Sequence, residues 1–125
     1  MKSQFINRLH VHYRSTSDGQ RFVILDLDFR YYSALLGRQV KVPAGFFSDG
    51  ASVPRILHWL YHPYGRYLEA AVVHDWFCVQ HNISSVTAAK VFLEAMEVCG
   101  VPAWRRNKMY WAVRMFGPRF KRRED

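Results

Sequence analysis

Residues 70–78 constrain the fold of this chain most, because they form an almost wholly apolar run with His74 and Asp75 at its middle. On a helix, residues 67–81 are apolar around most of the circumference, so this segment is predicted to be the central helix. A buried carboxylate without a partner is costly, which means that Asp75 needs a cation, the backbone or a functional group from another segment.

The length and composition of the chain favour one domain. The 125 residues are enough to bury a core without disulfides, and half of them are hydrophobic, which excludes a disordered body. Cys78 and Cys99 both lie in apolar helical patterns and are interpreted as buried thiols of a reducing compartment. The sequence shows neither a signal peptide nor an apolar run of the ~20 residues that a membrane span needs, so we expect synthesis in the cytoplasm.

Residues 1–47 are predicted to form a β-rich part. Residues 9–13 alternate polar and apolar side chains, residues 21–29 are rich in β-formers, and an Asp-Gly turn between them favours an antiparallel hairpin. A short strand follows at residues 39–42. The exposed face of the first strand carries His10 and His12, which we interpret as surface residues because no third zinc ligand lies nearby.

Residues 48–117 are predicted to form the helical part. A first helix spans residues 52–60 with Ser52 as its N-cap, the central helix spans residues 66–80, and a third begins at Ser84 or Ser85. In the third helix Val86 and Ala89 belong to the inner stripe, whereas Glu94 faces solvent. A last helix follows Gly100-Val101-Pro102 and has a second face formed by Trp104, Lys108, Trp111 and Met115. The predicted class is α+β, an antiparallel β-meander of three or four short strands followed by three or four packed helices.

The positive charge is concentrated near the C-terminus. The formal net charge is +8, and the basic residues of the last quarter are Arg105, Arg106, Lys108, Arg114, Arg119, Lys121, Arg122 and Arg123. Together with Trp104, Tyr110 and Trp111 they are suited to grip phosphates and stack on bases, to sit on an anionic membrane, or to contact other proteins. The structural interpretation is a solvated helix face followed by a basic tail at residues 118–125.

A family resemblance runs through these motifs. They are V-P-A-G-F at residues 42–46, S-D-G-A-S-V-P-R at 48–55, G-R-Y-L at 65–68, A-A-V-V-H-D at 70–75, F-L-E-A-M at 92–96, G-V-P at 100–102, M-Y-W-A-V at 109–113 and F-G at 116–117. In this order they closely resemble domain-of-unknown-function family 1353, which is common in phages and prophages. The resemblance spans about residues 38 to 117 and implies a phage or prophage origin, but it supplies no established activity.

One departure from the family concerns the third helix. The family pattern usually has Arg and Asp where this chain has Ser85 and Ala89. An aspartate at the inner position of Ala89 would point towards His74 or Asp75. That arrangement is similar, more distantly, to phospholipase A-two enzymes, in which a His-Asp pair supplies the general base and a calcium ligand, and a further Asp orients the His. This chain lacks their disulfides, their glycine-rich calcium loop and the orienting Asp.

Two interpretations of the His-Asp pair remain open. In the catalytic one Asp49, His74 and Asp75 converge on a water or a divalent metal ion, with His74 as general base. In the structural one Asp49, Ser52, Arg55 and Asp75 form a polar network: Ser52 caps a helix, and Arg55 pairs with Asp75.

We expect a small phage-encoded accessory or virion-associated protein on a fold with a vestigial His-Asp centre. Its partners would be other virion proteins or a host protein complex. One alternative is an active hydrolase, with or without the assistance of a divalent metal ion, that acts on lipid or cell-wall material. The other is a basic inhibitor or adaptor that binds nucleic acid or a host complex.

Overall fold

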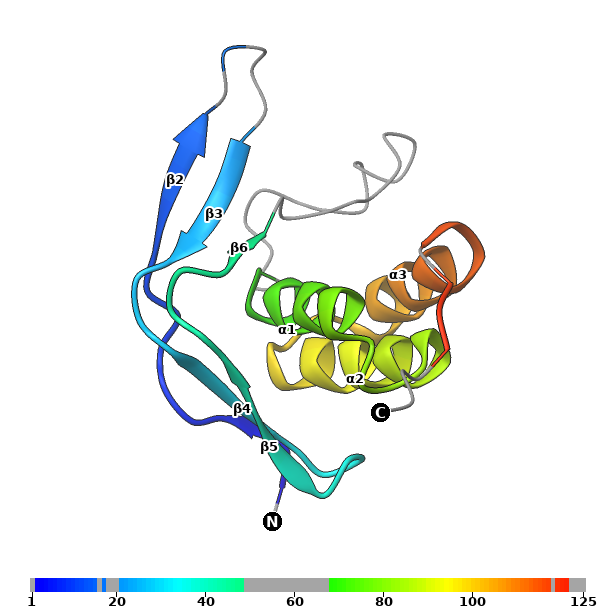
Figure 1. Ribbon diagram of the computed structural model, residues 1–125. Helices are drawn as coiled ribbons and strands as arrows, with labels where there is room; N and C mark the ends of the chain where they lie inside the picture. The colour runs from blue at the N-terminus through cyan, green and yellow to red at the C-terminus, as the bar shows by residue number, and fades with distance from the viewer. Residues whose placement is uncertain (1, 16, 18–20, 49–67, 118, 122–125) are drawn as a thin grey trace.

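The computed structural model of the chain describes residues 2–15, 17, 21–48, 68–117 and 119–121. Within these residues six strands precede three helices: β1 (Gln4–Phe5), β2 (Val11–Ser15), β3 (Arg21–Leu25), β4 (Phe29–Ser33), β5 (Arg38–Val42), β6 (Phe47–Ser48), α1 (Leu68–Gln80), α2 (Ser85–Val98) and α3 (Ala103–Phe116). The predicted α+β class is confirmed, with more strands than the three or four expected (Figure 1). The helix predicted over residues 52–60 lies outside the described residues.

The strands form two antiparallel sheets that are built from the same three stretches of chain. One sheet has the order β1-β4-β5 and the other the order β2-β3-β6. We call the stretch with β1 and β2 the first arm, that with β3 and β4 the second, and that with β5 and β6 the third. The second arm is central in both sheets. The β-part is therefore a single three-stranded meander that bends halfway along, which Figure 1 shows as a continuous curve.

The predicted hairpin is present, with Val11 opposite Leu25 in the β2–β3 pair. A second turn joins β4 to β5, and there Gly37 adopts φ +66°, a left-handed conformation that glycine adopts without strain. Strand β6 was not predicted. It has only two residues, paired with Val23 and Ile24, and so short a segment shows no alternation of polar and apolar side chains.

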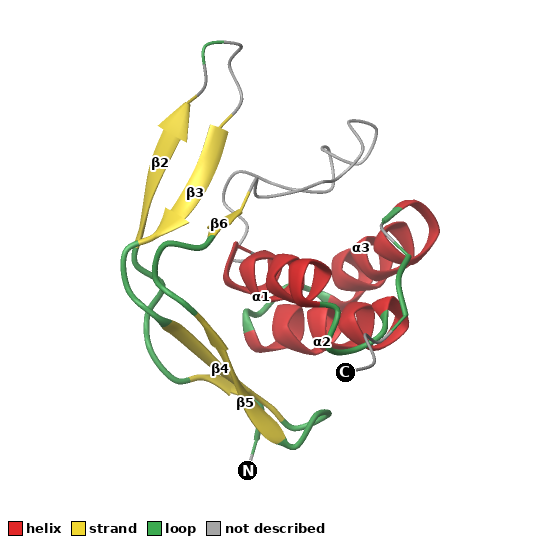
Figure 2. Cartoon of the chain, viewed as in Figure 1, coloured by secondary structure: helices red, strands yellow, loops and turns green. Residues whose placement is uncertain are grey.

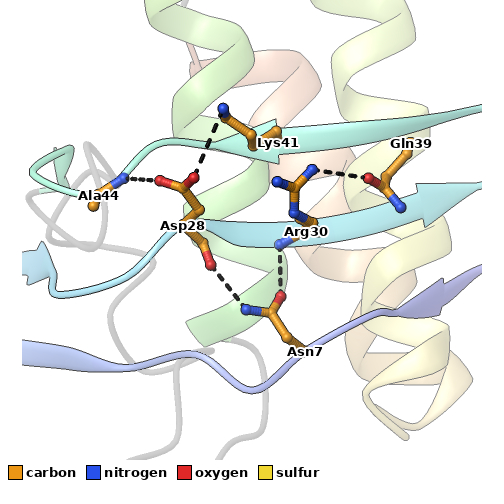
Figure 3. Close-up of polar contacts among 6 residues, drawn as sticks. All are labelled: Asn7, Asp28, Arg30, Gln39, Lys41 and Ala44. Atoms are coloured by element: carbon orange, nitrogen blue, oxygen red, sulfur yellow. Dashed lines mark hydrogen bonds and ion pairs between the residues drawn. The ribbon is translucent and has the colours of Figure 1, made fainter.

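Polar contacts of Asn7 and Asp28 join the three arms at the bend (Figure 3). The Asn7 side chain donates to the Asp28 carbonyl oxygen at 2.8 Å and accepts from the Arg30 N–H at 2.8 Å. The Asp28 carboxylate accepts from the Ala44 N–H at 2.8 Å, and Lys41 Nζ lies 3.7 Å from its other oxygen. The hydrogen bond from Ala44, followed by the charges of Lys41 and Arg30, lowers the pKa of Asp28 below its usual value.

All three helices lie on one side of the bent meander (Figure 2). Helix α1 packs on β5, β6 and α2, whereas α2 packs on β1, β4 and both other helices. The core between them contains Leu25, Phe29, Tyr31, Val40, Val42, Val72, Phe77, Phe92 and Met96. Helix α1 is buried over most of its surface, as its all-round apolar sequence predicts, and α2 shares the central place because it contacts both neighbours.

The ends of α2 follow from its flanking residues. The Ser84 hydroxyl accepts a hydrogen bond from the Thr87 N–H at 3.2 Å, so Ser84 rather than Ser85 is the N-cap. At the other end Gly100 has φ +83° and its N–H donates to the Glu97 carbonyl, which stops the helix before α3.

Two predictions for α2 were wrong. Val86, expected inside, is 40% exposed, because it lies in the first turn beyond the edge of the core. Glu94, expected to face solvent, turns to the sheet, where its carboxylate accepts from the Tyr31 hydroxyl at 2.6 Å and from the Leu35 N–H at 2.9 Å. Burial, followed by this contact with Glu94, raises the pKa of Tyr31. Glu94 therefore joins α2 to β4 and to the turn after it.

In the described part of the chain, none of the helices has the length and apolar character that crossing a bilayer requires.

Candidate functional site

His74 lies inside the protein, at the contact between α1 and α2. Its side chain is 9% exposed, and its ring centroid lies 5.0 Å from that of Phe92 with the planes inclined by 35°. Removing the imidazole from water disfavours its charged form, and this burial lowers the pKa of His74 to about 4. His74 is therefore neutral at pH 7 and packs as an aromatic residue of the core.

The Cys78 sulfur lies beside this imidazole, one helical turn along α1. Sγ is 3.7 Å from Nδ1 and 3.8 Å from Nε2, so it points at neither nitrogen in particular. A Cys-His nucleophile pair needs one directed hydrogen bond between thiol and base. The arrangement is that of a packing contact. Both cysteines of the chain are thiols rather than halves of a disulfide, as the sequence predicts, but each is partly exposed rather than buried.

The other proposed members of the catalytic group are placed only in part. Asp75 is half-buried and engaged in an interaction within the protein. Asp49, Ser52 and Arg55 lie outside the described residues, so the convergence of Asp49 with His74 and Asp75, and the Arg55–Asp75 pair, stay predictions. Ala89 is 1% exposed and lies one helical turn before Phe92, which confirms its inner position.

The described residues contain no cluster of three or more His, Cys, Asp or Glu side chains suited to a metal ion. His10 and His12 are both exposed, and His12 Nδ1 lies 2.6 Å from an Asp26 carboxylate oxygen. His12 thus has an acidic neighbour just beyond the end of the opposite strand β3. The structure places these two histidines on the surface, where the sequence analysis expected them.

The basic residues of α3 divide into two kinds. Arg106 is half-buried, and its guanidinium donates to the Val101 carbonyl at 3.0 Å, so part of its role is to hold the turn before α3. Arg105 and Lys108 instead place their charges 5.5 Å and 5.4 Å from the centre of the Trp104 ring, within reach of cation–π attraction. Arg114, in the last turn, donates to the Tyr110 hydroxyl at 3.4 Å. Arg122 and Arg123 lie outside the described residues.

Helix α3 also carries large apolar side chains in contact with water. Trp104 and Trp111 are each 58% exposed and Met115 is 61% exposed. Their spacing of seven and four residues puts them on one side of the helix together with Lys108. We call these four residues the α3 stripe. The opposite side of α3, with Met109 and Ala112, is buried in the core, so core packing fixes the helix that carries the stripe.

The start of the basic tail is docked rather than loose. The Phe120 ring stacks on His81 with centroids 4.3 Å apart and planes inclined by 10°, and the Phe120 carbonyl accepts from the Ser85 N–H at 2.9 Å. The chain leaves α3 through Gly117, where a Cβ atom would clash with the carbonyl oxygen of Val113. This contact could not be predicted from the sequence, because it joins residues far apart in the chain and no residue spacing indicates it.

Comparison with known proteins identifies relatives of unknown activity. The uncharacterized protein y4jT of Sinorhizobium fredii (strain NBRC 101917 / NGR234) is 39% identical over 85 residues, which cover 66% of this chain and 25% of that protein. The uncharacterized protein y4iH of the same organism is 35% identical over 75 residues, which cover 58% of this chain and 31% of that protein. The match therefore spans only about a quarter to a third of the length of these relatives.

No solved structure matches the chain at a significant level. The sequence profile described as "Protein of unknown function (DUF1353)" matches residues 23–113, which include most of β3, strands β4 to β6 and most of the helical part. The chain therefore belongs to the DUF1353 family of proteins of unknown function.

Proposed function

We propose that this protein is a phage-encoded accessory protein, associated with the virion, that works by binding another virion protein through the α3 stripe. The observation that carries the proposal is the exposure of Trp104, Trp111 and Met115 on one side of a firmly packed helix. Tryptophan, methionine and arginine are enriched at protein interfaces, and tryptophan often dominates the binding energy there. Grouped apolar side chains of this size on a surface favour an interaction site.

The mode of attachment of α3 supports this function. Met109 is 1% exposed and Ala112 9% exposed on the inner side, so the helix presents its outer side without first having to fold. Binding to such a preformed surface costs less conformational entropy than binding to a surface that becomes ordered only in the complex. The lengths of the relatives also support a module: in y4jT and y4iH the matched unit is one part of a longer protein.

The surroundings of His74 give less support to the hydrolase alternative. A general base has to reach the proton of its substrate, and it works best with a pKa near the operating pH. His74 is 9% exposed, and burial lowers its pKa to about 4. The surroundings of His74 are those of an aromatic side chain packed in the core.

Purified phage particles test the proposal. We expect the wild-type protein to be present in them, and the double variant Trp104→Ala/Trp111→Ala to be reduced at least about tenfold, because two interface tryptophans contribute several kcal/mol. The measurement is a quantitative immunoblot of particles and of the lysate. Tyr13→Ala is the matched control, since Tyr13 is 63% exposed but lies on β2, away from the stripe. Absence of the wild-type protein from particles, or full incorporation of the double variant, contradicts the proposal.

Nucleic acid is the second candidate partner, favoured by the cations over the Trp104 ring. Binding to phosphates would weaken steeply between 50 mM and 200 mM salt and with neutralisation of Arg105, Arg119 or Lys121. Affinity for an oligonucleotide that does not change with salt eliminates this candidate.

A further inference from the structure

The docked tail encloses one side of a basic cleft. The cleft lies between the first turn of α2, the last turn of α3 and residues 119–121, and has a volume of about 490 Å³. Arg114, Arg119 and Lys121 line it, and none of the other described residues that line it is acidic. Its apolar wall is formed by Val86, Val113 and Phe120. Three positive charges from two separate segments thus meet around one concave space.

The position of these charges is fixed by the contacts of the tail. Because Phe120 stacks on His81 and its carbonyl accepts from the Ser85 N–H, the residues on either side of it, Arg119 and Lys121, are held at the cleft. Arg114 is oriented from the other side by the Tyr110 hydroxyl. A loose tail would spread the same charges through solvent and form no site.

The cleft is suited to attract an anion through its basic side chains rather than through the N-terminus of α2. At the start of α2, the N–H groups of Ser85, Thr87 and Ala88 already donate to Phe120 and to Ser84. The guanidinium groups of Arg114 and Arg119 present forked donors that match the oxygens of a phosphate, and Lys121 adds a point charge. A volume of about 490 Å³ lies in the range of small-molecule sites, well above that of a lone inorganic ion.

We propose that this cleft binds a small phosphate monoester of about the size of a nucleoside monophosphate. The phosphate contacts Arg114, Arg119 and Lys121, and the rest of the molecule covers Val86, Val113 and Phe120. The cleft is separate from the exposed Trp104 and Trp111 of the α3 stripe, so this proposal goes beyond virion association, and either can fail without the other.

Calorimetric titration of the full chain with three probes at 50 mM salt provides the test. Adenosine monophosphate should bind, orthophosphate should bind at least about tenfold more weakly because it leaves the apolar wall uncovered, and adenosine should not bind measurably. In amide NMR spectra, adenosine monophosphate should shift the signals of Val86 and Lys121, and leave those of β2 and β3 unchanged.

Three variants connect the binding to the cleft. Arg119→Gln and Lys121→Gln should each weaken binding of adenosine monophosphate about tenfold, the usual effect of losing a charged hydrogen bond. Lys90→Gln is the matched control, because Lys90 is exposed on α2 outside the cleft, and it should bind like the wild type. Phe120→Ala should also weaken binding at least tenfold although it removes no charge, because it releases the tail and removes part of the apolar wall.

The proposal is overturned if adenosine monophosphate does not bind at millimolar concentration, or if adenosine binds equally well. It is also overturned if Lys90→Gln weakens binding as much as Lys121→Gln, since the attraction would then be a general effect of net charge. Binding that persists in Phe120→Ala would show that the docked tail does not form the site. A thermal unfolding curve recorded for each variant shows whether it remains folded at the temperature of the titration.

Discussion

Acidification should reveal the buried state of His74. The folded-state pKa is lowered to about 4 from the ordinary value of 6.5, so the unfolded chain binds a proton at His74 across this interval and the folded chain does not. The contribution of His74 to the free energy of unfolding is therefore greatest above pH 6.5 and is lost as the pH drops towards 4. A shift of about 2.5 pH units corresponds to roughly 3 kcal/mol, a large part of the stability of a small domain.

The assay compares urea denaturation at pH 7 and at pH 4 for the wild type and His74→Gln. Other groups titrate in both proteins, so the quantity of interest is the difference between their losses of unfolding free energy. We expect the wild type to lose about 3 kcal/mol more than His74→Gln. His10→Gln is the control, because His10 is exposed, and it should behave like the wild type.

Equal pH dependence of the wild type and His74→Gln would refute the reasoning. So would an NMR titration in which His74 of the folded protein changes charge near pH 6.5. Either result would mean that the imidazole is reached by water, and the hydrolase alternative would then regain support, since a general base near neutrality needs such access.

Two further predictions concern polar contacts of the sheet. Glu94→Ala should lower the free energy of unfolding by about 1–3 kcal/mol in urea denaturation, because the buried Tyr31 hydroxyl loses its acceptor. Glu97→Ala, at an exposed position of the same helix, is the control and should change the free energy of unfolding little. Asp28→Ala should lower the melting temperature at pH 7 by opening the bend. Because the pKa of Asp28 is lowered, its contribution is present above the ordinary value of 3.8 and is lost as the pH falls below it, so the wild type and Asp28→Ala should converge in melting temperature at low pH. A constant gap down to pH 2 would contradict this.

The parts of the fold that sequence analysis predicted correctly are those with a local periodic signal. The alternation in residues 9–13 and the Asp-Gly turn indicate the β2–β3 hairpin, and the apolar run around His74 indicates a buried helix. The chemistry of a serine hydroxyl indicates an N-cap at Ser84 or Ser85, and the structure selects Ser84. Each of these depends on residues only a few positions apart.

The features that escaped prediction depend on distant partners. Glu94 looks like a solvent-facing residue on a helical projection. Its carboxylate nevertheless accepts hydrogen bonds from Tyr31 and Leu35, about sixty positions earlier in the chain. Phe120 lies in a segment that reads only as a basic tail, and its docking requires the turn at His81. Of the candidate site, His74 and the α3 basic residues could be identified from the sequence by type, but the burial of His74 depends on packing against other segments, including Phe92 of α2.

The bend in the meander has a mechanical consequence. All three arms pass through the bend, and the hydrogen bonds of Asn7 and Asp28 join them to one another there. The sheet β2-β3-β6 can therefore change its angle to the sheet β1-β4-β5 only if all three arms bend together.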